Sequence, residues 1–266
     1  MTYSIKKNFP NIYTTGRSGS SICAELVNSN LGIKFEEWFS PNRYNFLLSK
    51  GIYTNKSSYL LYVFFLLQGG DSKKGIKITP HVFASDYWEQ NITANPIFIE
   101  SAKVSDDAIL LIRQNPLDTI KSYIYSGITG NWHSDQPIVP GKNLSDEELF
   151  KYANSRSLYI LKSEIRLIHL VNELHDDFKL FFYEDINVNR EQFMCNLLSC
   201  FTEKPFLIDH LVIPKMGKLT KEHLIEEKIE VVLQQVISGN EQIQTLLKER
   251  DFMLKAYGAL NRLHSS

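Results

Sequence analysis

Residues 11–27 read NIYTTGRSGSSICAELV, and this stretch decides the fold. Its first residues are apolar or β-prone and predict a short strand, which Gly16 and Gly19 interrupt with a serine-rich turn. From Ser21 the apolar residues recur at helical spacing until Gly32, which is placed to end a helix. The order of strand, glycine loop and helix brings backbone N–H groups together at one point, and such an arrangement suits an anion.

The rest of the chain alternates strand and helix patterns. The sequence predicts strands over residues 75–79, 96–100, 108–113 and 178–183. It predicts helices over residues 56–68, 145–173, 190–201 and much of the last 45 residues. This alternation predicts an α/β fold with a P-loop-like central parallel sheet flanked by helices, and a helical C-terminal segment.

The clearest strand and helix signals lie together near the middle of the chain. The run AILLIR at residues 108–113 is apolar until its last residue, as is typical of a central strand buried on both faces. Asn115 followed by Pro116 predicts the start of a helix, with asparagine as N-cap and proline in the first turn. Gly127 predicts its end.

Length and composition favour a single domain with a large core. The chain has 266 residues, of which 43% are hydrophobic. We expect a core over about residues 9–201 and a helical segment over about residues 202–266. The formal net charge of −1 disfavours nucleic acid as a partner, so any site for a polyanion must be local.

No part of the sequence predicts a membrane span or a secretion signal. The most apolar run, residues 59–67, is far shorter than the roughly 20 residues that a membrane-spanning helix needs, so we expect a core helix. The N-terminus MTYSIKKNFP lacks an apolar signal segment, and the expected location is the cytoplasm. Cys23, Cys195 and Cys200 have no metal-ligand spacing and are expected to be buried, reduced thiols.

Residues 15–21, TGRSGSS, form what we call the glycine-serine loop. Its glycines allow close backbone approach, its serines add hydroxyl donors, and Arg17 adds a positive charge. A loop for nucleoside triphosphates would read G-x-x-x-x-G-K-[ST], and the lysine is missing here. Phosphate transfer from ATP is therefore disfavoured, while a plain strand-to-helix turn remains an alternative for this segment alone.

A second candidate segment follows the predicted strand at residues 108–113. Arg113 stands at its carboxyl end, where open α/β sheets bind ligands. Ser122 lies about two turns into the next helix and can offer a hydroxyl to the same anion. An exposed arginine and an ordinary helix serine are the alternative interpretation.

These segments, taken in order, resemble the PAPS-dependent sulfotransferases (PAPS is 3′-phosphoadenosine 5′-phosphosulfate). The resemblance is closest to the bacterial trehalose 2-sulfotransferase-like family of carbohydrate sulfotransferases and covers roughly residues 9–201. It is carried by TGRSGSS at 15–21, GIK at 75–77, the arginine and serine of 113–122, TGNW at 129–132 and YED at 183–185. One departure is that Gln114 stands where the family's arginine is expected, one residue after Arg113.

The resemblance implies that PAPS is the sulfonate donor and that no metal is needed. The residues implied to hold its 5′-phosphosulfate are Gly16, Arg17, Ser18, Gly19, Ser20 and Ser21. Arg113 and Ser122 are implied to hold the 3′-phosphate. Lys215 and Lys218 resemble, more weakly, a basic loop that covers the same phosphate.

The general base is implied by a glutamate followed by two aromatic residues. The candidates are Glu36 and Glu37, and Glu37 resembles the family's base best. It stands before Trp38 and Phe39, and this aromatic pair can stack on a sugar ring. His81 ranks second and His133 third, because histidine is the base in many other sulfotransferases. Arg17 and Lys77 are expected to stabilise the charge that develops on the leaving oxygen.

The resulting hypothesis is an enzyme that transfers a sulfonate group from PAPS to a hydroxyl of a carbohydrate, a glycolipid or another small acceptor. Two alternatives stay open from the sequence. One is a non-catalytic nucleotide-binding protein with the same fold, which Gln114 favours, and the other is a small-molecule kinase with a degenerate phosphate loop. The resembled family includes homodimers, so a homodimer is one expected assembly.

Overall fold

A computed structural model gives the structure of the chain. It describes residues 3–6, 10–16, 19–53, 55–68, 74–83, 92–105, 107–130, 144–214 and 223–263.

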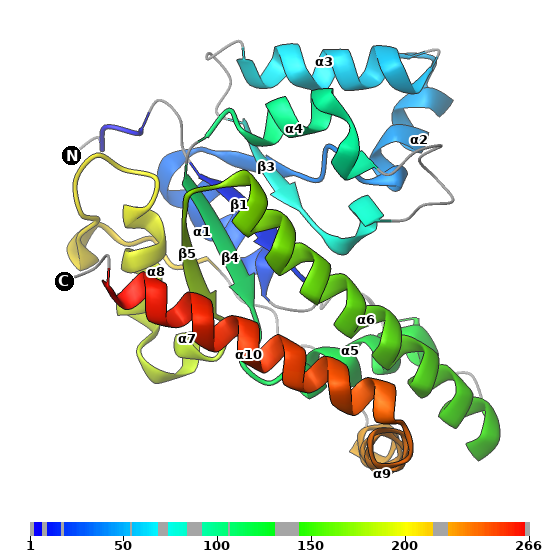
Figure 1. Ribbon diagram of the computed structural model, residues 1–266. Helices are drawn as coiled ribbons and strands as arrows, with labels where there is room; N and C mark the ends of the chain where they lie inside the picture. The colour runs from blue at the N-terminus through cyan, green and yellow to red at the C-terminus, as the bar shows by residue number, and fades with distance from the viewer. Residues whose placement is uncertain are drawn as a thin grey trace. The chain divides into compact units, whose positions relative to one another are not determined.

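The described residues contain a five-stranded sheet in which every strand pairing is parallel (Figure 1). Its order is β2-β3-β1-β4-β5, with β1 at Asn11–Thr14, β2 at Lys34–Glu36, β3 at Lys74–Ile78, β4 at Asp107–Ile112 and β5 at Asp177–Phe182. Because the strands are parallel, their carboxyl ends meet at one edge of the sheet, where open α/β sheets bind ligands. The α/β fold with a helix-flanked parallel sheet is therefore confirmed.

The helices alternate with these strands along the chain (Figure 1). They are α1 (Ser20–Leu31), α2 (Pro41–Ser49), α3 (Lys56–Gln68), α4 (Pro96–Ala102), α5 (Pro116–Thr129), α6 (Asp146–Leu174), α7 (Asp185–Val188), α8 (Arg190–Ser199), α9 (His223–Gly239) and α10 (Glu241–Leu263). The predicted helical C-terminal segment is thus confirmed as α9 and α10. The strand β2 and the helix α2 were not predicted.

The prediction of a strand at residues 96–100 is wrong, because this segment is α4. The Asn95 side chain accepts a hydrogen bond from the Ile97 N–H, and Pro96 occupies the first turn. Asparagine before proline is a helix-start signal, and it outweighs the β-prone residues that follow.

Gly127 does not end α5, which continues to Thr129 and stops at Gly130 with φ +69°. A Cβ on Gly127 would lie 1.9 Å from the Tyr152 hydroxyl oxygen. This glycine therefore serves the close approach of α6 to α5, and the left-handed backbone at Gly130 ends the helix.

The chain divides into two compact units, each made from two separate segments. Unit 1 comprises Met1–Ile112 and Leu167–Pro214 and contains the whole sheet, and unit 2 comprises Arg113–Arg166 and Lys215–Ser266. In unit 1 the middle of β4 is fully buried. In unit 2 a separate cluster of buried apolar side chains joins α5, α6, α9 and the start of α10. A single-domain organisation stays a prediction.

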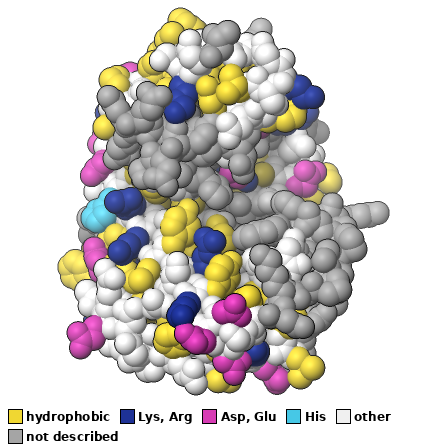
Figure 2. Space-filling view, turned by 90° about the vertical axis from the view of Figure 1, so that its right-hand side faces the viewer, with side chains coloured by type: hydrophobic (Ala, Val, Ile, Leu, Met, Phe, Trp, Pro, Cys, Tyr) yellow, Lys and Arg dark blue, Asp and Glu magenta, His cyan; other side chains and the backbone are white. Residues whose placement is uncertain are grey.

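The helix α3 is only half buried, although its apolar sequence predicts a core helix. Tyr59 and Val63 are buried, while Leu61 is 45% and Phe65 66% exposed. Figure 2 shows hydrophobic side chains on the surface at the top of the molecule, where Figure 1 draws α3. Within the described part of the chain, no helix is both long and apolar enough to cross a membrane.

The three cysteines are buried and none forms a disulfide, as the sequence predicts. Cys23 lies on the inner face of α1, and Cys195 and Cys200 lie on and just after α8.

Candidate functional site

The glycine-serine loop leads from β1 into the first turn of α1. Gly19 has φ +77° and is the N-cap of α1, and among the described residues no side chain accepts a capping hydrogen bond from the helix. The first turn, which includes Ser20 and Ser21, has N–H groups of the kind that bind anions at helix starts. Gly16 lies in the turn just after β1, while Arg17 and Ser18 fall outside the described residues.

Gly19 is also required by its neighbour Tyr183. A Cβ on Gly19 would lie 2.1 Å from two ring carbons of Tyr183, so no other residue fits without moving the ring. Tyr183 follows β5 directly, and its N–H donates to the Ile112 carbonyl at 2.9 Å. The tyrosine of the YED segment thus packs on the start of α1, at the carboxyl edge of the sheet.

The predicted base and one predicted cation form an ion pair at the same edge. The Lys77 Nζ lies 2.9 Å from the Glu37 Oε1, and the Thr79 hydroxyl donates to the Glu37 Oε2 at 3.3 Å. Glu37 follows β2, Lys77 lies near the end of β3, and the two strands pair directly. The Glu37 side chain is 31% exposed, so its carboxylate is both held in place and reachable from solvent. Thr79 is a member of this group that the sequence did not suggest.

Trp38 and Phe39 are core residues, which contradicts the expectation that they stack on a sugar. Trp38 is 2% and Phe39 1% exposed, and the Phe39 ring packs edge-on against Phe98 at 4.7 Å. The Tyr59 hydroxyl donates to the Trp38 carbonyl. The aromatic pair therefore anchors the chain next to Glu37 and presents no ring to an acceptor.

The remaining candidates for the base and for the basic loop are only partly described. The backbone of His81 lies in the short 3₁₀ helix Pro80–Phe83, just beyond Thr79, and its side chain is outside the described residues. His133, Lys215 and Lys218 also fall outside the described residues.

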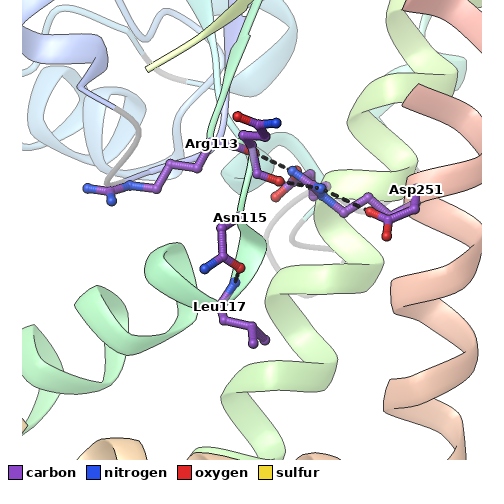
Figure 3. Close-up of polar contacts among 7 residues, drawn as sticks. Arg113, Asn115, Leu117 and Asp251 are labelled. Atoms are coloured by element: carbon purple, nitrogen blue, oxygen red, sulfur yellow. Dashed lines mark hydrogen bonds and ion pairs between the residues drawn. The ribbon is translucent and has the colours of Figure 1, made fainter. Parts of the chain in front are cut away.

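Unit 2 contains both residues that the resemblance assigns to the 3′-phosphate. Arg113 comes directly after β4, and Ser122 is a buried residue on the second turn of α5. The Asn115 side chain accepts from the Leu117 N–H at 3.1 Å and so caps α5, as predicted. Figure 3 shows the Arg113 side chain pointing away from Asp251.

The backbone of the turn between β4 and α5 is held by a buried arginine that the sequence did not reveal (Figure 3). Arg250, on α10, donates to the carbonyl oxygens of Arg113 and Gln114, the latter at 3.1 Å. Its Nε lies 2.6 Å from the Glu164 Oε1 on α6, and both side chains are fully buried.

Comparisons with known proteins found no relative of the chain. No family model matches the chain, and the searches of curated proteins and of solved structures found no match either.

Proposed function

We propose that the protein transfers the sulfonate group of PAPS to a hydroxyl group of a carbohydrate or glycolipid, with Glu37 as the general base. The observation that carries this proposal is the group of Glu37, Lys77 and Thr79 at the carboxyl edge of the parallel sheet. A base, a cation and a hydroxyl meet there through an ion pair and a hydrogen bond, and the Glu37 side chain is partly exposed while Thr79 is buried.

The start of α1 fits the anionic end of the donor. No side chain of the described residues caps the helix at Gly19, whose left-handed backbone and missing Cβ are both needed at this point. Ser20 and Ser21 add hydroxyl groups to the first turn. A sulfonate or phosphate bound here gains backbone N–H donors and the favourable end of the helix dipole.

The reaction is a displacement at sulfur. Glu37 takes the proton of the acceptor hydroxyl as the hydroxyl oxygen forms its new bond to sulfur. The bond between sulfur and the bridging phosphate oxygen breaks, and its electron pair stays on that oxygen. The products are the sulfate ester and 3′-phosphoadenosine 5′-phosphate (PAP), and the proton remains on Glu37 until it passes to solvent.

Lys77 and Thr79 hold the two Glu37 oxygens in fixed positions before the acceptor arrives. Each carboxylate oxygen has a second lone pair, so one of them can still accept the acceptor hydroxyl. When the proton reaches Glu37, the Lys77 ammonium loses its carboxylate partner. It can then stabilise negative charge on the departing oxygen.

The test compares PAP with ATP plus Mg²⁺ in thermal unfolding of the full chain. We expect PAP at about 100 times its Kd to raise the melting temperature by roughly 5 °C or more, because it binds only the folded protein. ATP with Mg²⁺ is expected to give a much smaller shift. Equal shifts would contradict the proposal and favour the kinase hypothesis.

Transfer of labelled sulfonate from PAPS to a panel of sugars and glycolipids tests the chemistry itself. Formation of a labelled ester supports an enzyme. If PAP binds tightly but PAPS supports no transfer to any acceptor, the hypothesis of a non-catalytic nucleotide-binding protein is favoured instead.

A further inference from the structure

We infer that Arg250 is a positioning residue for the 3′-phosphate of the donor: it fixes the turn at residues 113–115, from which Arg113 extends. This inference rests on the proposed function. It assigns a role to a residue of the C-terminal helix α10, which lies outside the stretch of about residues 9–201 that resembles sulfotransferases.

The guanidinium group of Arg250 joins three parts of unit 2. Its Nε lies 2.6 Å from the Glu164 Oε1, one terminal nitrogen donates to the Gln114 carbonyl at 3.1 Å, and the other donates to the Arg113 carbonyl. These three contacts use the forked donor set of arginine in separate directions. A lysine, with one compact ammonium, cannot reproduce all three at once.

The two carbonyl groups lie in the short turn between β4 and α5. The Ile112 carbonyl, at the end of β4, accepts the Tyr183 N–H, and α5 starts only at Pro116. The carbonyls of Arg113 and Gln114 lie between these two hydrogen-bonding patterns, on a half-buried and an exposed residue, and the buried Arg250 side chain reaches both of them. Arg250 donates to both carbonyl groups, and Figure 3 shows the Arg113 side chain pointing away from Asp251, the residue that follows Arg250 on α10.

The burial of the ion pair between Arg250 and Glu164 favours one geometry of the turn. The Arg250 and Glu164 side chains are both fully buried. A buried ion pair adds little net stability over a well-packed apolar pair, and its best-attested use is to select one geometry. Here the geometry selected is that of the turn that carries Arg113.

The test measures the affinities of PAP and adenosine 5′-monophosphate (AMP), which lacks the 3′-phosphate, by calorimetry on the full chain. For the unchanged protein we expect PAP to bind more tightly than AMP. For Arg250→Lys we expect the affinity for PAP to fall about tenfold or more. The affinity for AMP should stay within about twofold. The ratio of the two affinities is the readout, because a general loss of stability would not change it.

Two further variants keep the test decisive. Glu164→Gln removes the partner charge with little change of shape and should lower the same ratio, which provides a second route if Arg250→Lys does not fold. Asn154→Ala removes a 2.7 Å hydrogen bond to Asn240 elsewhere in unit 2, and it should lower stability without changing the ratio.

The outcomes separate the two claims. If the unchanged protein binds PAP more tightly than AMP but Arg250→Lys and Glu164→Gln keep the full ratio, the role of Arg250 is disproved and the proposed function stands. If the unchanged protein does not prefer PAP to AMP, the proposed function fails and the role of Arg250 fails with it.

Discussion

At the scale of single residues, Glu37 and its neighbour Glu36 provide a built-in comparison. Both are partly exposed carboxylates at the end of β2, but Glu37 pairs with Lys77 and Glu36 pairs with Arg43 at 2.5 Å. We expect Glu37→Gln to lower the rate of sulfonate transfer roughly 10²- to 10⁴-fold, because an amide cannot take the proton. The affinity for PAP should not change.

Glu36→Gln is the matched control, since it removes an adjacent carboxylate that we place outside the reaction. Initial rates with PAPS and any acceptor that is turned over, together with calorimetry for PAP, distinguish the two variants. Full activity of Glu37→Gln would rule out Glu37 as the base and favour His81.

Gly19 is expected to be intolerant of substitution for two separable reasons. Gly19→Ala forces a left-handed backbone on alanine, at roughly 1–2 kcal/mol, and it also places a Cβ against the Tyr183 ring. Gly51→Ala is the control, because Gly51 has φ +68° with no atom within 4 Å of a built Cβ. Urea denaturation should therefore show a larger loss for Gly19→Ala than for Gly51→Ala.

The clash itself can be relieved by removing the ring. Gly19→Ala should cost less stability in a Tyr183→Ala background than in the unchanged protein. An equal cost in both backgrounds would show that the ring is not the obstacle.

Cys23 should be chemically inert in the folded protein. Burial raises the pKa of its thiol to about 12, from an ordinary value of 9.0. At pH 8.5 the thiolate is then almost absent from the native state, and iodoacetamide should modify Cys23 only after denaturation in urea. Mass spectrometry of protein treated with and without urea checks this.

The raised pKa of the Cys23 thiol also predicts that the free energy of unfolding falls in alkali. Because the folded pKa is raised, the contribution of Cys23 is complete below pH 9 and is lost as pH rises from about 9 to about 12. Rapid modification of the native protein at pH 8.5 would contradict the burial of this side chain.

At the scale of elements, an asparagine followed by a proline starts two helices, and only one of them is predicted from the sequence. Asn115–Pro116 predicts the start of α5, and Asn95–Pro96 starts α4 in the same way. The second segment was misassigned because Ile97, Phe98 and Ile99 are typical of strands. The buried residues of α4 are Phe98, Ser101 and Ala102, and this spacing of three and four residues is that of a helix.

Both asparagine caps should contribute measurably to stability. Asn95→Ala and Asn115→Ala are each expected to lower the free energy of unfolding by about 1 kcal/mol, because each removes the acceptor for a backbone N–H. Asn95→Asp should retain most of the stability, since aspartate caps as well. A negligible effect of Asn95→Ala in urea denaturation would contradict the capping role.

The strand β2 could not be predicted for a different reason. It has only three residues, Lys34–Glu36, and none of them is fully buried. Its position is fixed by pairing with β3, where Phe35 lies opposite Gly75 and its ring fills the space that a side chain on that glycine would take. Such a strand is specified by its partner, and its own pattern is too short to detect.

At the scale of the whole molecule, the sequence predicts structure that neighbouring residues specify, but not contacts between residues far apart in the chain. The order of strand, glycine-serine loop and helix lies within about 20 residues, and so it is legible from spacing alone. Arg250 and Glu164 lie 86 residues apart, each in a helix whose sequence mixes charged and apolar residues. Nothing near either residue in the chain indicates that they meet in the core.

The split of each unit into two segments has a consequence for the order in which the chain can fold during synthesis. Four strands of the sheet are complete once Ile112 has been made, but β5 must wait until the ribosome has passed through Phe182. Until then β4 is an unpaired edge strand whose residues 108–112 are all apolar, the kind of surface on which nascent chains aggregate. Chaperones should therefore associate most strongly with ribosome-bound chains that end after Ile112 and before Phe182.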